Sequence, residues 1–159
     1  MGTAVGIQYN FVSTTQQAPL GFKLKRVDPD NPDRGEQEWI YVKANVALAA
    51  GNVCMRASGE PKYEVRKSLV GGCPPGSVCG VAQHTIAQDS YGFILRSGIG
   101  NVLPDGAATI VINEGLMPSN GTAGTAEAAG ATQTAAVFGW ALATASGGAV
   151  TQCVISCQG

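Results

Sequence analysis

The sequence contains little charge. Asp, Glu, Lys and Arg make up 13% of its 159 residues, and the formal net charge is −1, whereas a typical soluble domain carries about 25% charged residues. All ten basic residues lie between Lys23 and Arg96, so the chain from residue 97 onward contains no Lys or Arg. The lack of a concentrated positive surface excludes nucleic acid as an expected partner. The only charged residues after residue 96 are Asp105, Glu114 and Glu127, and such a sparsely charged C-terminal half favours close packing against another protein.

Long apolar runs are also absent. No run approaches the roughly 18 apolar residues that a membrane-spanning helix needs, so the sequence predicts no membrane partner. The N-terminus lacks the basic start and apolar stretch that mark a secretory signal. We therefore expect a soluble protein that is made in a cytoplasm.

The sequence offers few residues for catalysis or cofactor binding. It contains no G-x-x-x-x-G-K-[ST] phosphate loop, no G-x-G-x-x-G and no G-x-S-x-G elbow. His84 is the only histidine, and it could form a triad with Asp89 and Ser90 only across a hairpin turn. We therefore expect no catalytic residue, no cofactor and no enzymatic activity.

Two groups of residues contain side chains that bind metal ions in other proteins. Residues 28–35 include three aspartates, but two prolines interrupt the alternation that a calcium-binding EF-hand loop needs. Four of the five cysteines could bind zinc with the single histidine, but C-x5-C and C-x3-C are not the common C-x2-C spacing. We expect no metal site and interpret the cysteines as free thiols, most of them buried. A disulfide between Cys73 and Cys79 in an oxidising medium stays open as an alternative.

A similar pattern occurs at residues 80–98 and 139–159. Each copy begins at Gly, continues with a short apolar run, passes through a polar turn and ends with a second apolar run and Gly. Asp, Ser and Gly in the turns favour hairpin conformations. Two hairpins of one design predict a small all-β core. We expect the first, which contains Gln83 and Arg96, to face solvent and the second to form core or interface.

Alternation of apolar and polar residues predicts further strands. Residues 4–12 form the first of them, with an apolar face made by Val5, Ile7, Tyr9 and Phe11. Residues 13–19 indicate an extended connector. The other expected strands lie at residues 22–27, 37–44, 52–56, 63–66 and 107–112. The strand at 63–66 carries alternating charges, which is typical of an edge strand.

Residues 119–136 have low complexity and consist mainly of Gly, Ala and Thr. They contain too little apolar side chain to fold by themselves, so we expect them to be mobile or held by a neighbouring subunit. A short helix at residues 126–129 is compatible with the alanines there.

The chain is long enough for one domain with a real core. We assign residues 1–35 to an N-terminal strand and arm or loop region, and residues 36–159 to a single β domain. The predicted fold class is all-β: a small β-barrel or β-sandwich built of hairpins, with an N-terminal extension and long Gly/Ala-rich loops.

From Tyr41 onward, the order of features resembles the head decoration (capsid cement) proteins of tailed bacteriophages. The resemblance rests on V-K-A-N-V-A-L-A-A-G at residues 42–51, G-V-A from Gly80, I-N-E-G-L around Gly115 and F-G-W-A-L at 138–142. These features cover about two thirds of the chain, and the N-terminal 35 residues lie outside them.

The resemblance implies a compact β-barrel or β-sandwich that assembles on the outer surface of a phage capsid and has no enzymatic activity. Its partners would be the major capsid protein and copies of itself, with a trimer favoured and a dimer as the alternative. It would be made in the host cytoplasm and located on the virion exterior. We expect the contacts to come from residues 4–17, from residues 119–136 and from five side chains in particular: Val5, Ile7, Tyr9, Phe11 and Trp140.

A β-rich tail, spike or adhesin module that binds a host glycan is the alternative function. Such a module would carry an aromatic side chain outside the core, beside Asp or Asn. Trp39 is the best candidate in the sequence, but its position in a strand favours burial.

Overall fold

The computed structural model describes residues 8–57, 63–70, 73–74, 76–130, 137–146 and 148–158. Within these ranges the regular structure consists of twelve strands and one short 3-10 turn, which confirms the predicted all-β class. They are β1 (Lys23–Val27), β2 (Glu36–Ala44), β3 (Val53–Arg56), β4 (Glu64–Lys67), β5 (Val78–Val81), β6 (Tyr91–Val102), β7 (Thr109–Ile110), β8 (Gly115–Pro118), β9 (Ala126–Ala128), β10 (Gly139–Ala141), β11 (Ala145–Ser146) and β12 (Thr151–Ser156). The 3-10 turn, η1 (Pro32–Arg34), lies in the loop between β1 and β2.

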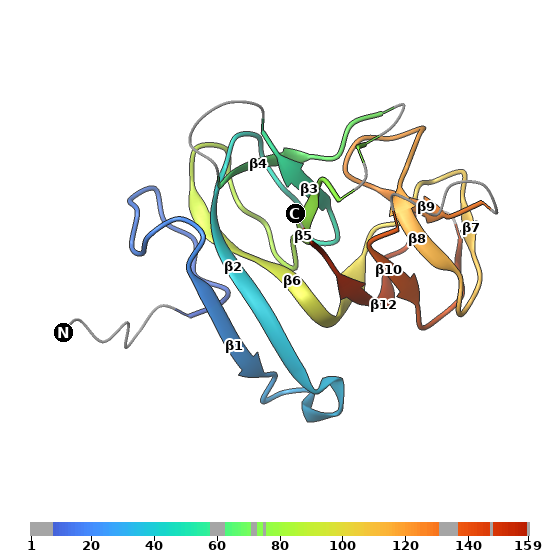
Figure 1. The fold of residues 1–159 in the computed structure, drawn as a ribbon, viewed down its shortest axis with the longest axis horizontal. Helices are drawn as coiled ribbons and strands as arrows, with labels where there is room; N and C mark the ends of the chain where they lie inside the picture. Colours follow the sequence, from blue (N-terminus) through green and yellow to red (C-terminus); the bar gives the residue numbers. More distant parts are fainter. Residues whose placement is uncertain are drawn as a thin grey trace.

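Five strands close into a small barrel. Their order is β2-β4-β3-β5-β6, and the antiparallel pairing of β6 with β2 closes the ring. The barrel occupies the left and upper part of Figure 1. The strand predicted at residues 63–66 is present as β4, but its predicted position at a sheet edge is wrong, because β4 lies between β2 and β3 and pairs with both.

Side chains from all five barrel strands fill the interior. They are Ile40, Val42 and Ala44 from β2, Cys54 from β3, Val65 from β4, Cys79 from β5 and Ile94 from β6. Leu48 and Ile86, which form an isolated β-bridge, belong to the same cluster. Burying each of the larger side chains stabilises the fold by about 1.5–3 kcal/mol.

The central strands β2 and β6 are buried on both faces. Trp39 and Tyr41 alternate with the interior residues of β2, and they join Phe93 and Leu95 of β6 in a second apolar cluster. Because successive side chains of a strand point to opposite faces, this second cluster lies on the outside of the barrel. The rest of the chain must therefore cover it, and both the N-terminal segment and the C-terminal strands do so.

Residues 8–22 cross the outer face of β2 and β6. The Tyr41 N–H donates to the Phe22 carbonyl at 2.8 Å, and Ser13 and Tyr91 exchange backbone hydrogen bonds of 3.1 and 2.8 Å. These bonds satisfy backbone groups that would otherwise be buried without partners. The described part of the predicted N-terminal arm is therefore folded onto its own barrel.

Of the strand predicted at residues 4–12, the structure describes only the part from Gln8. This part turns at Tyr9, where the Phe11 N–H donates to the Gln8 carbonyl at 2.9 Å, so the strand prediction is wrong here. The turn brings the Tyr9 ring onto Trp39, with 4.9 Å between ring centroids. This aromatic contact with the barrel replaces the strand pairing that the alternation suggested.

The C-terminal residues build a sheet on the second half of β6. β12 pairs with β6 over six residues, and β10, β8 and β9 follow in that order on the right of Figure 1. The antiparallel pairing of β10 with β12 confirms the hairpin predicted at residues 139–159. Within its connection, β11 pairs with β7 as a separate two-stranded sheet.

β5 and β6 form the hairpin predicted at residues 80–98, but residues 82–90 make its connection longer than expected. Gln83 therefore lies in this loop, where its side chain accepts a hydrogen bond from the Asn101 N–H (2.8 Å) and donates one to the Asn101 carbonyl (2.9 Å). Phe93 and its neighbours in β6 are fully buried. The expectation that this hairpin faces solvent is wrong, because β6 is shared by the barrel and the C-terminal sheet.

The strand predicted at residues 107–112 is much shorter in the structure. Only β7 remains, because the chain turns at Asn113, whose φ is 72° and whose N–H donates to the Ala141 carbonyl at 2.9 Å. Val111 and Ile112, which the sequence pattern placed in the strand, are about half exposed in this turn.

The described part of residues 119–136 is held by two carboxylates. The Ser119 hydroxyl donates to Asp105 at 2.5 Å, and this bond holds the pKa of Asp105 below its usual range. Glu127 accepts hydrogen bonds from the Asn120 N–H and side-chain amide at 3.2 and 2.6 Å. The prediction that this segment does not fold by itself is wrong up to residue 130, because contacts within the chain order it. Strand β9 takes the place of the suggested helix, and residues 131–136 lie outside the described ranges.

Four of the five cysteines are buried free thiols. Burial raises the pKa of Cys79 and of Cys153 to about 12, which keeps both thiols protonated and unreactive. Cys73 is half-buried and is also a free thiol. Within the described residues, no three His, Cys, Asp or Glu side chains are grouped to hold a metal ion. In the same ranges, no helix has the length and apolar character that crossing a membrane requires.

Glu38 on β2 carries a carboxylate from which we expect a pH dependence of stability. Arg96 Nη1 donates to its carboxylate at 2.7 Å, and Lys23 Nζ lies 3.8 Å away. The hydrogen bond from Arg96 holds the pKa of Glu38 below its ordinary value of 4.5. Because the folded-state pKa is lowered, this stabilisation is present above the unfolded-state pKa and is lost as pH falls through the folded value.

We expect the free energy of unfolding to fall between about pH 6 and about pH 3 in both the native protein and Glu38→Gln. The fall should be about 1 kcal/mol larger in the native protein, because only it loses the ion pair of Glu38. Denaturant unfolding at a series of pH values measures the difference. If the free energy of unfolding changed equally with pH in the two proteins, the Glu38–Arg96 pair would not be a source of stability.

Candidate interaction surfaces

Trp140 lies on the outer face of the C-terminal sheet. Its side chain is 45% exposed, although its neighbours Gly139 and Ala141 are buried. Directly opposite Trp140 are Val154 on β12 and Gly115 on β8. Directly opposing residues of antiparallel strands share a face, so these positions form a row across the sheet.

The row extends at both ends. Val154 lies opposite Ile99 of β6, which continues the row onto a fourth strand. At the other end, Val137 is 40% exposed, and its methyl groups lie about 3.5 Å from where a side chain on Gly115 would begin. We call the resulting surface the Trp140 face; it consists of Ile99, Gly115, Val137, Trp140 and Val154.

The Trp140 face is electrically neutral. Strands β8, β10 and β12 contain no Asp, Glu, Lys, Arg or His. Removing such a surface from water requires no charge to be desolvated, and exposed tryptophans are frequent anchors of protein interfaces. The chemistry of this face therefore suits contact with an apolar protein surface.

The five contact residues predicted from the sequence do not form one surface in the structure. Val5 and Ile7 lie outside the described residues. Tyr9 is half-buried between Trp39 and the Arg26 guanidinium, which lies 3.6 Å from the Tyr9 ring centroid.

Phe11 is 47% exposed and lies beside Gly92, near the start of β6. Trp140 lies in the C-terminal sheet, two strands away from β6: it is opposite Val154 of β12, which in turn is opposite Ile99 near the far end of β6. Because β6 rises about 3.3 Å per residue, these two exposed aromatic side chains belong to different surfaces.

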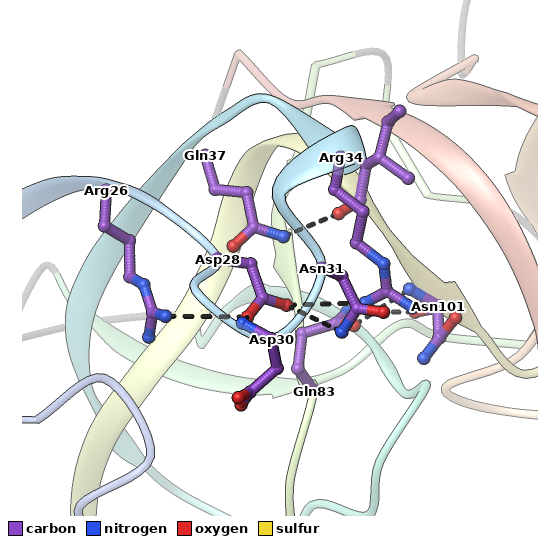
Figure 2. A network of polar contacts seen from close by, with 9 residues as sticks. Arg26, Asp28, Asp30, Asn31, Arg34, Gln37, Gln83 and Asn101 are labelled. Atoms are coloured by element: carbon purple, nitrogen blue, oxygen red, sulfur yellow. Dashed lines mark hydrogen bonds and ion pairs between the residues drawn. The ribbon is translucent and has the colours of Figure 1, made fainter.

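A polar site lies under the loop that joins β1 to β2 (Figure 2). Asp28 forms ion pairs with Arg26 at 3.7 Å and Arg34 at 4.0 Å, and it accepts hydrogen bonds from the Asp30 N–H and the Asn31 amide. Burial alone would raise the pKa of Asp28, but these four donors and cations hold it below its usual range. Of the three carboxylates that the sequence offered as calcium ligands, that of Asp28 is therefore turned toward protein donors.

Behind this loop is a pocket of about 130 Å³, which we call the loop pocket. Its lining comes from four parts of the chain: Tyr9, Asp28, Arg34, Gln37, Trp39, Gln83 and Asn101. Trp39 is only 2% exposed, which confirms the burial expected for it. Its indole Nε1–H, however, has no hydrogen-bond partner within the described ranges.

The comparisons with known proteins identify the fold. No family model and no curated protein matches the sequence. Among solved structures, the chain is similar to the head fiber N base of bacteriophage phi29, with a TM-score of 0.55 and 18% sequence identity. The match covers 74% of this chain and 92% of that one. At this level of identity the likeness establishes a shared fold.

Proposed function

We propose that this protein is a structural component of a phage virion, seated on the outer surface of the head. The observation that carries the proposal is the fold shared with the phi29 head fiber N base, which covers nearly all of that chain. The resemblance of residues 42–142 to capsid cement proteins, found in the sequence independently, supports the same location.

In this proposal the protein binds the major capsid protein and further copies of itself, with a trimer as the favoured assembly, and it catalyses no reaction. The Trp140 face supplies an apolar, uncharged contact surface. Neutral surfaces can be repeated around a symmetric shell without accumulating repulsion. Each added contact buries surface at a junction between capsid subunits, so many modest interfaces together resist internal pressure.

Heads that lack the protein test this function directly. We expect the purified protein to bind such heads saturably and to raise the temperature at which they release their DNA, because a ligand of the intact head stabilises it by mass action. Serum albumin at the same concentration is the control. Failure of the protein to sediment with the heads would contradict the proposal.

A further inference from the structure

We propose that the free edge of β1 binds an extended segment of another protein in which acidic residues alternate with apolar ones. The bound segment would pair with β1 as a further strand of the sheet, a mode of recognition in which the main chain supplies affinity and the side chains supply specificity. The inference concerns the isolated chain and does not depend on its place in a virion.

Strand β1 lies at one end of the ten-stranded sheet. Within the described residues β2 is the only strand that pairs with it, and Figure 1 shows the two strands as a hairpin that extends beyond the barrel. At the other end of the sheet, the chain covers the start of β9. The Ala126 N–H donates to the Leu103 carbonyl at 2.9 Å, and the Ala126 carbonyl accepts from the Asp105 N–H at 2.8 Å. The β1 end is therefore the more open of the two.

The pairing with β2 determines which backbone groups of β1 are free. The Tyr41 N–H donates to the Phe22 carbonyl at 2.8 Å, and hydrogen-bonded positions alternate along an antiparallel pair. The N–H and C=O groups of Lys23, Lys25 and Val27 therefore point away from β2. Outside the β1–β2 pairing, these three residues form no backbone hydrogen bond in the described ranges. Such a row of free groups is a template for another strand.

The lysine side chains of β1 favour an acidic partner. Lys23 and Lys25 are 51% and 62% exposed, and each forms one ion pair with a glutamate of β2, Glu38 at 3.8 Å and Glu36 at 3.4 Å. An ammonium group has three donors, so each lysine can also bind a carboxylate on the open side of β1. Glutamates opposite the lysines would form cross-strand pairs of opposite charge, which stabilise a sheet.

The same lysines disfavour pairing between two copies of β1. In the centred antiparallel register, Lys25 of one copy lies opposite Lys25 of the other. A shift by two residues places Lys23 opposite Lys25, or Arg26 opposite Arg26. Like charges directly opposite one another are destabilising, and lysines on edge strands commonly prevent such contacts. The edge therefore selects against itself and against basic strands.

The other face of β1 offers space for apolar side chains. A groove of about 430 Å³ lies there, lined by Gln8, Tyr9, Asn10, Leu24, Arg26, Pro29 and Asp30. Leu24 and Arg26 alternate with the lysines along the strand, so the groove and the ammonium groups lie on opposite faces. Tyr9 and Leu24 are partly buried apolar side chains that pack against the core. Every second side chain of an added strand would point to this face, where apolar residues fit.

Three synthetic peptides test the proposal. The probe is acetyl-Thr-Val-Glu-Val-Glu-Val-Thr-amide. One control replaces both glutamates with lysine, and the other, acetyl-Thr-Glu-Glu-Val-Val-Val-Thr-amide, has the same composition without the alternation. Each is titrated into the ¹⁵N-labelled native protein and followed by NMR. The alternating acidic peptide should bind saturably, with a dissociation constant of about 1 mM or lower, and about tenfold more tightly than either control.

Hydrogen exchange distinguishes strand addition from ionic contact alone. At saturation with the acidic peptide, exchange of the Lys23, Lys25 and Val27 amides should slow about tenfold or more, because each gains a hydrogen-bond partner. The amides of Leu24 and Arg26, which face β2, are the internal reference and should change less than about twofold.

Substitutions locate the site on β1. Lys25→Gln should weaken binding of the acidic peptide about threefold or more, whereas Lys67→Gln, on β4 in the barrel, should not. Lys25→Pro should abolish binding, because it removes an outward N–H and leaves the pairing with β2 intact. The NMR spectra show whether each variant is folded, and the peptides with the native protein decide the matter if one is not. Lack of saturable binding, equal binding of the lysine peptide, or binding without slower exchange of the three amides would overturn the proposal.

Discussion

Replacing Gly139 with alanine should lower the free energy of unfolding by about 3 kcal/mol and the melting temperature by about 10 °C. A Cβ at this position would overlap the Val154 carbonyl oxygen on the paired strand β12. The clash is with backbone, so no side-chain rotation can relieve it. β10 and β12 would have to separate, which would open the C-terminal sheet at its centre.

A neighbouring glycine supplies the control. Gly115 lies on β8 in the same sheet, and a Cβ there would meet its neighbours at 3.5–3.6 Å, an ordinary contact distance. Gly115→Ala should change stability by less than about 1 kcal/mol. Thermal and denaturant unfolding measure both variants. Equal stability of Gly139→Ala and the native protein would mean that β10 and β12 are not packed as closely as described.

Truncating Trp140 should have the largest effect on assembly. We expect Trp140→Ala to weaken binding to phage heads, or between copies of the chain, by about 30-fold or more, since tryptophan anchors at interface centres contribute about 2 kcal/mol or more. Its half-exposed side chain contributes little to the monomer core. The unfolding free energy should therefore change by less than about 1 kcal/mol.

Val27→Ala is the matched control, because Val27 is 52% exposed at the end of β1, away from the Trp140 face. Sedimentation with heads and analytical ultracentrifugation of the free protein measure the two kinds of contact. Unchanged binding by Trp140→Ala in both assays would exclude the Trp140 face as the contact surface. Ile155→Asp cannot replace this test, because Ile155 is fully buried and its loss would affect folding first.

Strands that carry a continuous local pattern could be predicted from the sequence. Strand β2 is buried on both faces and therefore has a continuous apolar run, whereas β12 is buried on one face and alternates residue by residue. Sequence patterns predicted the wrong structure where contacts between residues far apart in the sequence determine the conformation. Residues 119–130 contain no large apolar side chain, and they are ordered by the carboxylates of Asp105 and Glu127 instead. Tyr9 fits a strand pattern but lies in a turn, because its ring packs on Trp39.

The candidate surfaces, too, could be predicted only in part from the sequence. Trp140 could be selected from the sequence, since a large aromatic residue in a neutral, glycine-rich segment is an unusual feature. Its exposure followed only from the register that places it opposite Val154 and Gly115. The loop pocket gave no sequence signal, because the residues that line it come from Tyr9 to Asn101 and meet only when the loop after β1 folds onto β6. Trp39 was considered for glycan binding, and the orphaned N–H of its buried ring could be found only in the structure.

The number of copies on purified virions tests the central claim most directly. Quantitative mass spectrometry against the major capsid protein gives the copy number, and antibody labelling of intact particles shows whether those copies lie on the head. A protein of the outer head surface should follow the capsid symmetry, with copies on the order of hundreds per particle and label over the head. Absence from the particle, or a few copies confined to the tail, would contradict the account.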